Sequence, residues 1–276
     1  MTVAELVRQT AEALRKAGID SAARDARELV AMALGDEPGR LILRMGESAG
    51  PDAMQVLADI LPDRLARKPL SHITRRRAFW RHDFTVTPDV LDPRPETEAL
   101  VAEALQGSWD RVLDLGTGSG CILLSLLAER AAAHGLGIDL SPASLAIAEA
   151  NGRRLGLADR VEWRLSDWFG AVPERFDLIV SNPPYIGVHE MGGLAPELAH
   201  EPRMALTDGA DGLSAYRVLV GGAAAHLVPG GRLLVEIGWR QADSVTALFT
   251  AAGFVRICVL RDLDGRDRVV SGYLRG

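Results

Sequence analysis

An asparagine, two prolines and a tyrosine directly follow an apolar, strand-like run. The run is Leu178-Ile179-Val180, and the tetrapeptide after it is Asn182-Pro183-Pro184-Tyr185. The asparagine side-chain oxygen and the Pro183 carbonyl can accept hydrogen bonds from both N–H groups of a planar nitrogen, and the tyrosine offers a flat face. The prolines stiffen this backbone and remove competing N–H donors. Few reactions need this arrangement, and methylation of a planar amide or amine nitrogen is one of them.

A glycine-rich turn follows a second apolar run. The segment reads Val112-Leu113-Asp114-Leu115-Gly116-Thr117-Gly118-Ser119-Gly120 and opens a helix. Glycines in such a turn let the backbone approach a ligand closely. After the next strand, Asp139 stands 19 residues beyond Gly120, where a carboxylate can bind both ribose hydroxyls. The sequence therefore predicts a nucleoside-bearing cofactor.

The spacing of the glycines favours one kind of cofactor. They read Gly-x-Gly-x-Gly and not the Gly-x-Gly-x-x-Gly of dinucleotide binders, so a pyrophosphate is not required. Asp114 suits the cationic amino-acid end of S-adenosylmethionine, either directly or through water. Asp167 and Trp168, after the third strand, can bind the adenine amino group and cover its ring. The alternative interpretation is a set of ordinary tight turns with a core tryptophan.

The bulk composition excludes several classes of protein. With 276 residues, 47% of them hydrophobic and 25% charged, the chain is long enough for one large and one small domain. A net charge of −6 argues against a protein whose main role is to bind duplex nucleic acid. Cys121 and Cys258 form neither a disulfide framework nor a metal-ligand spacing. There is no signal-peptide pattern and no apolar run near the ~18 residues of a membrane helix, so we expect a soluble, cytoplasmic protein.

Three segments differ in their periodicity. Residues 1–68 show helical spacing and predict a small helical domain, in which Pro62 should bend or divide the last helix. Residues 69–95 alternate and carry several prolines, which predicts a β-hairpin linker. From residue 96 to 276 strands alternate with helices, which predicts an α/β domain with a parallel, doubly wound sheet. Its strands are expected at 111–115, 134–139, 161–165, 176–181, 232–237, 255–260 and 268–273.

Several of these motifs together resemble a known family. They are Pro93-Arg94-Pro95-Glu96-Thr97-Glu98, the segment Asp114 to Gly120, the tetrapeptide, and Glu201-Pro202 through Leu206 to Asp211-Gly212-Leu213. The chain resembles class I S-adenosylmethionine-dependent methyltransferases, and within them the protein glutamine N5-methyltransferases that modify peptide-chain release factors. The resemblance spans essentially the whole chain. Two departures are His72, where tyrosine is expected, and the absence of the usual glycine from Thr74-Arg75-Arg76-Arg77.

The resemblance implies a fold, a substrate and a mechanism. The fold is a mostly parallel, seven-stranded Rossmann-like sheet with a helical substrate-recognition domain. The substrate is the glutamine of the Gly-Gly-Gln motif in class I release factors, with no membrane association and no stable binding of nucleic acid. S-adenosylmethionine donates the methyl group, and S-adenosylhomocysteine is the product. No side chain is assigned as a general base.

The expected site residues fall into two overlapping groups. Asn182, Pro183, Pro184 and Tyr185 are expected to bind and position the substrate amide. The cofactor is expected to contact Asp114, Gly116, Thr117, Gly118, Ser119, Gly120, Asp139, Asp167, Trp168 and Asn182. No metal is expected, because His189, His200, Glu190, Glu197 and Glu201 have a spacing that fits a loop better than a ligand set.

Other interpretations remain open at this level. A sister branch of the family methylates a ribosomal-protein glutamine, and the same tetrapeptide serves DNA adenine-N6 methyltransferases. A noncatalytic cofactor-binding module is a third alternative. Glu96 and Glu98 either interact favourably with the positive end of the helix that they open or help to arrange the entrance of the active site. A basic group is either a solvated face or a docking surface, and consists of Arg64, Arg67, Lys68, Arg75, Arg76, Arg77 and Arg81.

Overall fold

A computed structural model describes the whole chain, residues 1–276. It divides into two compact units, one formed by Met1–Arg76 with Ala195–His200 and the other by Arg77–Leu194 with Glu201–Gly276. The sequence placed the end of the helical domain at residue 68. The observed division lies at Arg76 because Leu70–Thr74 forms a further helix, α4, inside the first unit. The expected hairpin is shorter than the predicted linker and lies in the second unit, with strands β1 (Arg77–Phe79) and β2 (His82–Phe84).

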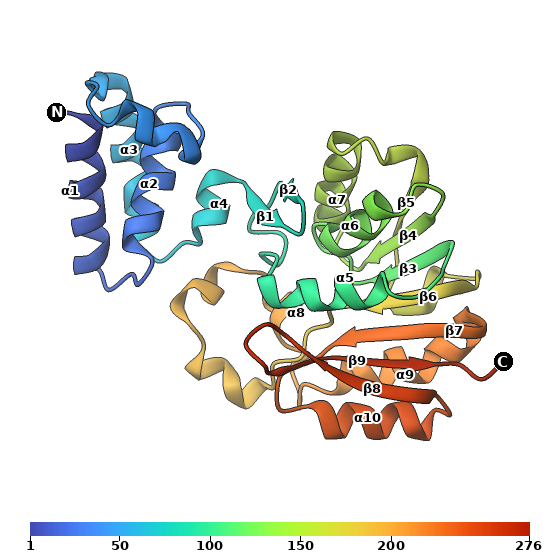
Figure 1. The fold of residues 1–276 in the computed structure, drawn as a ribbon. Helices are drawn as coiled ribbons and strands as arrows, with labels where there is room; N and C mark the ends of the chain where they lie inside the picture. Colours follow the sequence, from blue (N-terminus) through green and yellow to red (C-terminus); the bar gives the residue numbers. More distant parts are fainter. The chain divides into compact units, whose positions relative to one another are not determined.

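The first unit is a small helical bundle (Figure 1). Its other helical elements are α1 (Val3–Lys16), α2 (Ala22–Ala33), the 3-10 helix η1 (Pro38–Arg44) and α3 (Gly50–Leu65). Helix α1 begins with a capping box, in which the Thr2 hydroxyl accepts from the backbone of Glu5 and the Glu5 carboxylate accepts from that of Thr2. The core between the helices is aliphatic, as the periodicity predicted, with Leu14, Leu29 and Val30 fully buried.

Pro62 does not divide helix α3; of the two effects that the sequence predicted for it, a division is wrong and a bend stays a prediction. The helix runs unbroken from Gly50 to Leu65. Because Pro62 lies in its last turn, only the helical hydrogen bond from that single position is lost. Beyond it, the guanidinium of Arg64 is buried and donates to the Asp25 carboxylate at 2.8 Å, and it also pairs with Glu197. The last turn of α3 is thus held by a buried ion pair.

The second unit is built on a seven-stranded sheet with the order β5-β4-β3-β6-β7-β9-β8. Neighbouring strands from β5 to β7 run parallel, and β9 pairs antiparallel with both β7 and β8. The predicted fold class is confirmed. The strands are β3 (Arg111–Leu115), β4 (His134–Asp139), β5 (Val161–Leu165), β6 (Phe176–Ser181), β7 (Leu227–Glu236), β8 (Val255–Arg261) and β9 (Asp267–Tyr273).

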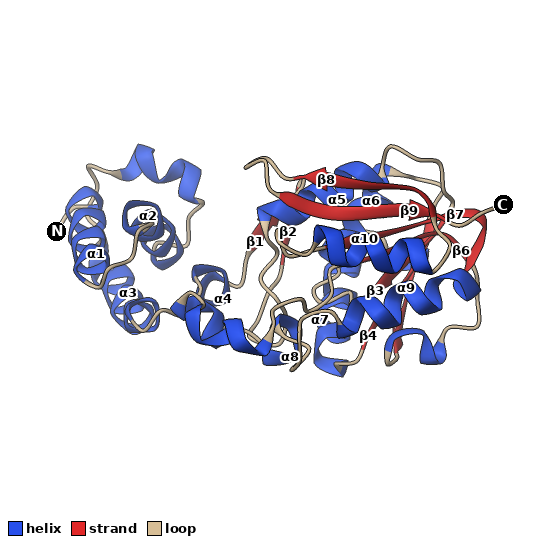
Figure 2. Cartoon of the chain, turned by 90° about the horizontal axis from the view of Figure 1, so that it is seen from below, coloured by secondary structure: helices blue, strands red, loops and turns tan.

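Helices cover both faces of this sheet (Figure 2). Successive residues of the central strands alternate between the two cores: Leu113 and Ile179 pack on one side, Val112 and Leu178 on the other. Helices α9 and α10 cover the first side, and α5 and α6 cover the second. The helices are α5 (Glu98–Ala104), α6 (Cys121–Glu129), α7 (Pro142–Arg154), α8 (Arg203–Leu206), α9 (Ser214–His226) and α10 (Ala242–Ala251).

The topology fixes where a ligand site can form. Because β3, β4, β5, β6 and β7 are parallel, the loops after their carboxyl ends meet along one edge of the sheet. The glycine turn, Trp168 and the tetrapeptide lie in the segments that follow these strands, and Asp139 is the last residue of β4. No helix of the chain is long and apolar enough to cross a membrane.

The missing glycine of the linker has a structural consequence. Arg75 ends helix α4 in the left-handed conformation, with φ 53°, and its side chain is exposed. A residue with a Cβ atom is disfavoured there by about 1 kcal/mol relative to glycine. We therefore expect Arg75→Gly to raise the free energy of unfolding by roughly 0.5–1 kcal/mol, measured by urea unfolding. Arg75→Ala, which keeps the Cβ atom, should not gain stability, and a less stable glycine variant would contradict this account.

Candidate active site

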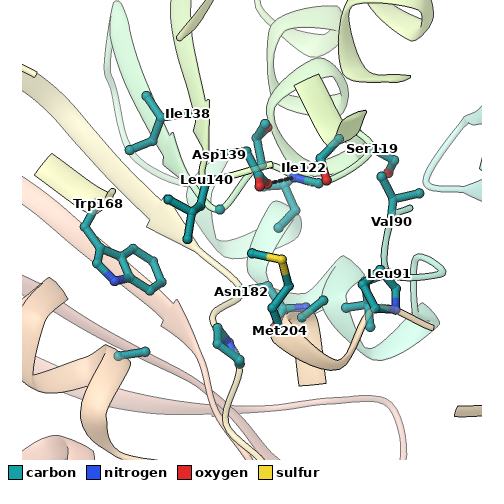
Figure 3. A pocket seen from close by; sticks show the side chains of 18 of the residues that line it. Val90, Leu91, Ser119, Ile122, Ile138, Asp139, Leu140, Trp168, Asn182 and Met204 are labelled. Atoms are coloured by element: carbon teal, nitrogen blue, oxygen red, sulfur yellow. Dashed lines mark hydrogen bonds between the residues drawn. The ribbon is translucent and has the colours of Figure 1, made fainter. Parts of the chain in front are cut away.

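A cavity of about 370 Å³ lies at the carboxyl edge of the sheet, entirely within the second unit. This volume falls in the range of small-molecule sites. Nine residues that the sequence assigned to the cofactor or the substrate line it: Gly116, Thr117, Gly118, Ser119, Asp139, Asp167, Trp168, Asn182 and Pro184. Most of the other lining side chains are apolar, among them Val90, Leu91, Ile122, Leu140 and Met204 (Figure 3).

The glycine turn after β3 is held against the end of β4. Gly116 and Gly118 have φ values of 73° and 56°, which side chains with a Cβ atom rarely adopt. The backbone N–H groups of Gly116 and Thr117 donate to the Ile138 carbonyl at 3.0 and 2.8 Å. Gly120 also has a positive φ, but it caps α6 and packs against Trp163 and Leu124, and it does not line the cavity. Its contact with the cofactor stays a prediction.

Asp139 occupies the position expected of a ribose-binding carboxylate. It ends β4, lines the cavity and accepts hydrogen bonds from the N–H groups of Gly118 and Ser141, each at 2.9 Å (Figure 3). Burial raises the pKa of this carboxyl group, and the two N–H donors oppose that rise. The carboxylate is therefore held rigidly at the cavity wall and links the glycine turn to the start of α7.

Asp114 lies behind the cavity wall. Its side chain is fully buried, and its Oδ2 atom accepts from the Thr117 hydroxyl at 2.7 Å, while Oδ1 has no hydrogen-bond partner. Burial raises the pKa of Asp114 to about 7, partly offset by the Thr117 hydrogen bond. Asp114 thus supports the turn through Thr117. A contact with the cofactor, direct or through water, stays a prediction.

Trp168 forms one wall of the cavity in a strained backbone conformation. Its φ is 45°, and the Ser166 hydroxyl donates to its carbonyl at 2.8 Å. The ring stands on the opposite side of the cavity from Leu91, next to Leu140 (Figure 3). Asp167 lines the cavity beside it and is exposed. This placement suits the predicted cover over an adenine ring.

The asparagine of the tetrapeptide lines the cavity and has a buried acceptor without a partner. The Asn182 side-chain Nδ2 donates to the Thr97 hydroxyl at 3.2 Å, whereas Oδ1 is buried and has no partner. Pro184 also lines the cavity, and Pro183 is buried behind it. An unpartnered buried oxygen is costly. The binding of a substrate N–H group by this oxygen stays a prediction.

Tyr185 takes a different position from the one that stacking requires. Its ring packs against the core below α9 and α10 and is absent from the cavity wall. Burial and the nearby carboxyl group of Glu236 raise the pKa of its hydroxyl well above its usual value. Its backbone carbonyl accepts from the Gln241 side chain at 2.9 Å. Tyr185 therefore fixes the tetrapeptide in the structure, and its stacking role stays a prediction.

The segment after the tetrapeptide returns to cover the cavity. Met204 and Ala205 of α8 line it (Figure 3). Just before α8, the carboxylate of Glu201 is buried, pairs with Arg94 and accepts from the backbone N–H of Asp92 at 3.2 Å. The segment Pro93 to Glu98 is thus tied by an ion pair to the segment that begins at Glu201.

The residues considered as metal ligands are engaged elsewhere. Glu197 pairs with Arg64 and Arg67, Glu201 with Arg94, and Glu190 accepts from the Gly187 N–H. Most residues of the basic group also pair with carboxylates, and the two interpretations of this group, a solvated face or a docking surface, both stay open. Its remaining pairs are Lys68 with Asp63, Arg76 with Glu37, Arg77 with Asp92 and Arg81 with Glu129.

Comparison with known proteins identifies the family. A release factor glutamine methyltransferase from Cereibacter sphaeroides is 54% identical over 275 residues and covers 99% of both chains. One from Rhodospirillum rubrum is 43% identical and covers all of this chain and 86% of its own. The chain belongs to the release factor glutamine methyltransferase family. The PrmC N-terminal domain matches residues 5–74, and the Methyltransferase small domain matches residues 92–255.

Solved structures agree on the fold of the catalytic unit. A methyltransferase from Pyrococcus furiosus superposes with a TM-score of 0.55 at 18% identity, covering 72% of this chain and 92% of its own. A 16S rRNA methyltransferase from Thermus thermophilus gives 0.51 at 23% identity, covering 72% and 50%. Together with the family, they make this chain an S-adenosylmethionine-dependent methyltransferase, as the sequence predicted.

Some cavity residues had no signal in the sequence. Val90, Leu91 and Leu140 are apolar side chains in loops, and their types suggest no chemistry. Glu236, at the end of β7, is 1% exposed, and burial raises its pKa to about 7. A single glutamate at the end of an apolar strand is the only sequence signal that could have identified it.

The position of Asp139 leads to a test of cofactor binding. Hydroxyl groups of a ribose donate more strongly to a carboxylate than to a neutral amide. We expect Asp139→Asn to raise the dissociation constant for S-adenosylhomocysteine by about tenfold, measured by isothermal titration calorimetry. Asp243→Asn, at an exposed acidic residue of α10, should leave it unchanged, and equal affinity in both variants would refute the assignment.

The buried carboxyl group of Asp114 leads to a test by pH. Its folded pKa of about 7 exceeds the value of 3.8 for a free aspartate, so the folded protein binds more protons than the unfolded chain between these pH values. The stability associated with this group is present below about pH 4 and is lost as the pH rises through 7. We expect Asp114→Asn to gain stability relative to the wild type from pH 4 to pH 8, measured by urea unfolding. A difference that is constant over this range would show that Asp114 ionises normally.

Proposed function

We propose that this protein transfers a methyl group from S-adenosylmethionine to the side-chain nitrogen (N5) of the glutamine in the Gly-Gly-Gln motif of class I release factors. The observation that supports this most directly is the unpartnered Oδ1 of Asn182 at the wall of the cavity. A primary amide has two N–H groups and a delocalised lone pair, so the enzyme must fix its plane. The names of the family's curated relatives, which are release factor enzymes, support the choice of substrate.

Each part of the site has a defined task in this proposal. When bound, S-adenosylmethionine supplies an electrophilic methyl group. Asn182 Oδ1 and the Pro183 carbonyl accept the two N–H groups of the glutamine side chain and fix its orientation. Asp139 and Trp168 hold the nucleoside end of the cofactor, and the apolar side chains of Leu91, Leu140 and Met204 form part of the cavity wall. The product nitrogen loses its extra proton to water, so no general base is required.

The alternatives have less support. For adenine methylation, a nucleic-acid substrate needs a strong positive surface, but the chain carries a net charge of −6 and most of its basic group is paired with carboxylates. A ribosomal-protein glutamine would fit the same acceptors. We place the enzyme in the cytoplasm, where release factors act.

Transfer of labelled methyl groups tests the substrate. Purified release factor and labelled S-adenosylmethionine are incubated with the enzyme, beside a release factor in which the glutamine of Gly-Gly-Gln is changed to alanine. We expect label on the normal factor alone. Label on both factors would place the acceptor elsewhere, and label on ribosomal protein or nucleic acid but on neither factor would overturn the proposal.

Removal of the Asn182 carboxamide tests the mechanism. Asn182→Ala takes away a preorganised acceptor, and we expect kcat to fall by about 30-fold or more, which corresponds to about 2 kcal/mol. Methyl transfer is measured at saturating cofactor and release factor. Thermal unfolding serves as the control for folding, and a normally folded variant with wild-type kcat would remove Asn182 from the mechanism.

A further inference from the structure

The orientation of the Asn182 carboxamide decides whether the site can accept a substrate N–H group. The oxygen and the nitrogen of a carboxamide have nearly the same shape, but only the oxygen accepts hydrogen bonds. If the group were rotated by half a turn, an NH2 group would face the cavity and oppose the NH2 group of the substrate. Some neighbouring group must therefore select one of the two orientations.

Thr97 is the neighbour that contacts the nitrogen. Its hydroxyl accepts from Asn182 Nδ2 at 3.2 Å, and the residue is only 2% exposed. A hydroxyl alone does not select an orientation, because it can either donate or accept. It selects the nitrogen only if its own hydrogen is already engaged with another acceptor.

Glu236 lies where it can provide that acceptor. Its carboxyl group is 1% exposed and its Oε2 atom has no hydrogen-bond partner, while the nearby hydroxyls of Thr97 and Tyr185 oppose the rise in its pKa that burial causes. The sheet register pairs Ser181 of β6 with Val235 of β7, so Glu236 and Asn182 follow at the same level of the two strands. Burial raises the pKa of Glu236 to about 7, and the positive charge of Arg268 opposes that rise. In either form the carboxyl group keeps an oxygen that can accept from the Thr97 hydroxyl.

We propose that Thr97 and Glu236 are positioning residues for methyl transfer: Glu236 engages the hydroxyl hydrogen of Thr97, Thr97 then accepts from the NH2 group of Asn182, and the oxygen of Asn182 is left facing the substrate amide. This inference rests on the proposed glutamine methylation. It gives Thr97, in the segment Pro93 to Glu98, a defined task. The Tyr185 hydroxyl also acts on the pKa of Glu236, so a single carboxyl group lies close to both ends of the tetrapeptide.

Variants of Thr97 test the proposal directly. Thr97→Val keeps the shape and removes the hydroxyl, and we expect kcat for release factor methylation to fall by about 10- to 100-fold. Affinity for S-adenosylhomocysteine should stay within about twofold, since Thr97 acts on the substrate side. Thr97→Ser restores the hydroxyl and should recover kcat to within about threefold of the wild type. Thr246→Val, at a threonine of α10 whose hydroxyl has no partner, is the matched control and should leave kcat unchanged.

A double variant tests the connection between the two residues. Glu236→Gln presents an NH2 group that can donate to Thr97 and thereby release its hydroxyl hydrogen toward Asn182. We expect a loss of kcat similar to that of Thr97→Val, and we expect the combination of both changes to be no worse than either alone. Independent, multiplicative losses would show that the two residues act separately and would overturn the proposal.

The outcomes distinguish this inference from the proposed function. If the wild type methylates no release factor, the proposed function fails first. If the wild type is active and folded Thr97→Val is equally active, the inference fails alone. Equal losses in the valine and serine variants would indicate a packing role and would also overturn it. If Thr97→Val does not fold, the comparison of Thr97→Ser with Glu236→Gln decides: loss in the second but not in the first supports the proposal, and full activity in both refutes it.

Discussion

The methyl transfer that we propose requires one orientation of the Asn182 carboxamide, and several elements of the catalytic unit hold this residue in place. Asn182 follows β6, which pairs with β3 on one side and β7 on the other, so the tetrapeptide begins at a strand fixed from both sides. Gln241 then holds the Tyr185 carbonyl, and Thr97 holds the Asn182 nitrogen. A planar amide offers its nitrogen poorly, because the lone pair is delocalised. Rigid acceptors reduce the ordering that each substrate molecule must undergo.

Three buried or half-buried carboxyl groups lie along the same edge of the sheet. Burial raises the pKa of Asp114, Asp139 and Glu236. Ionisation of these groups therefore lowers the stability of the folded protein. Asp114 accepts from the Thr117 hydroxyl, and Asp139 accepts from the backbone N–H groups of Gly118 and Ser141. A cationic ligand in the cavity would favour the ionised forms of the nearest groups. When ionised, the carboxyl groups at this edge of the sheet therefore lower the stability of the fold and attract a positively charged cofactor.

The fold could be predicted best from the sequence where a strand is largely buried. Strands β3, β4 and β6 have the bounds that were predicted, because their apolar runs end at glycines or polar loops. The edge strand β5 also has its predicted bounds, although none of its residues is buried. Strand β7 begins at Leu227, whereas the prediction began it at residue 232. The prediction began the strand too late because Pro229 and the glycines after it are typical of a turn. The place of residues 195–200 in the helical unit could not be predicted, since it depends on pairing between Glu197 and arginines about 130 positions earlier.

Only some of the predicted site residues line the cavity. The reason is that a sequence motif contains both residues that touch the ligand and residues that hold the backbone in place. Gly118, Asp139 and Asn182 reach the cavity, whereas Gly120, Asp114 and Tyr185 stand behind it. Gly120 allows close packing of α6, Asp114 binds the Thr117 hydroxyl, and Tyr185 faces Glu236. A side chain that holds the backbone in place is as restricted in type as one that touches the ligand. A motif read from sequence therefore identifies the site as a whole, while only the structure separates the contacting residues from those that position them.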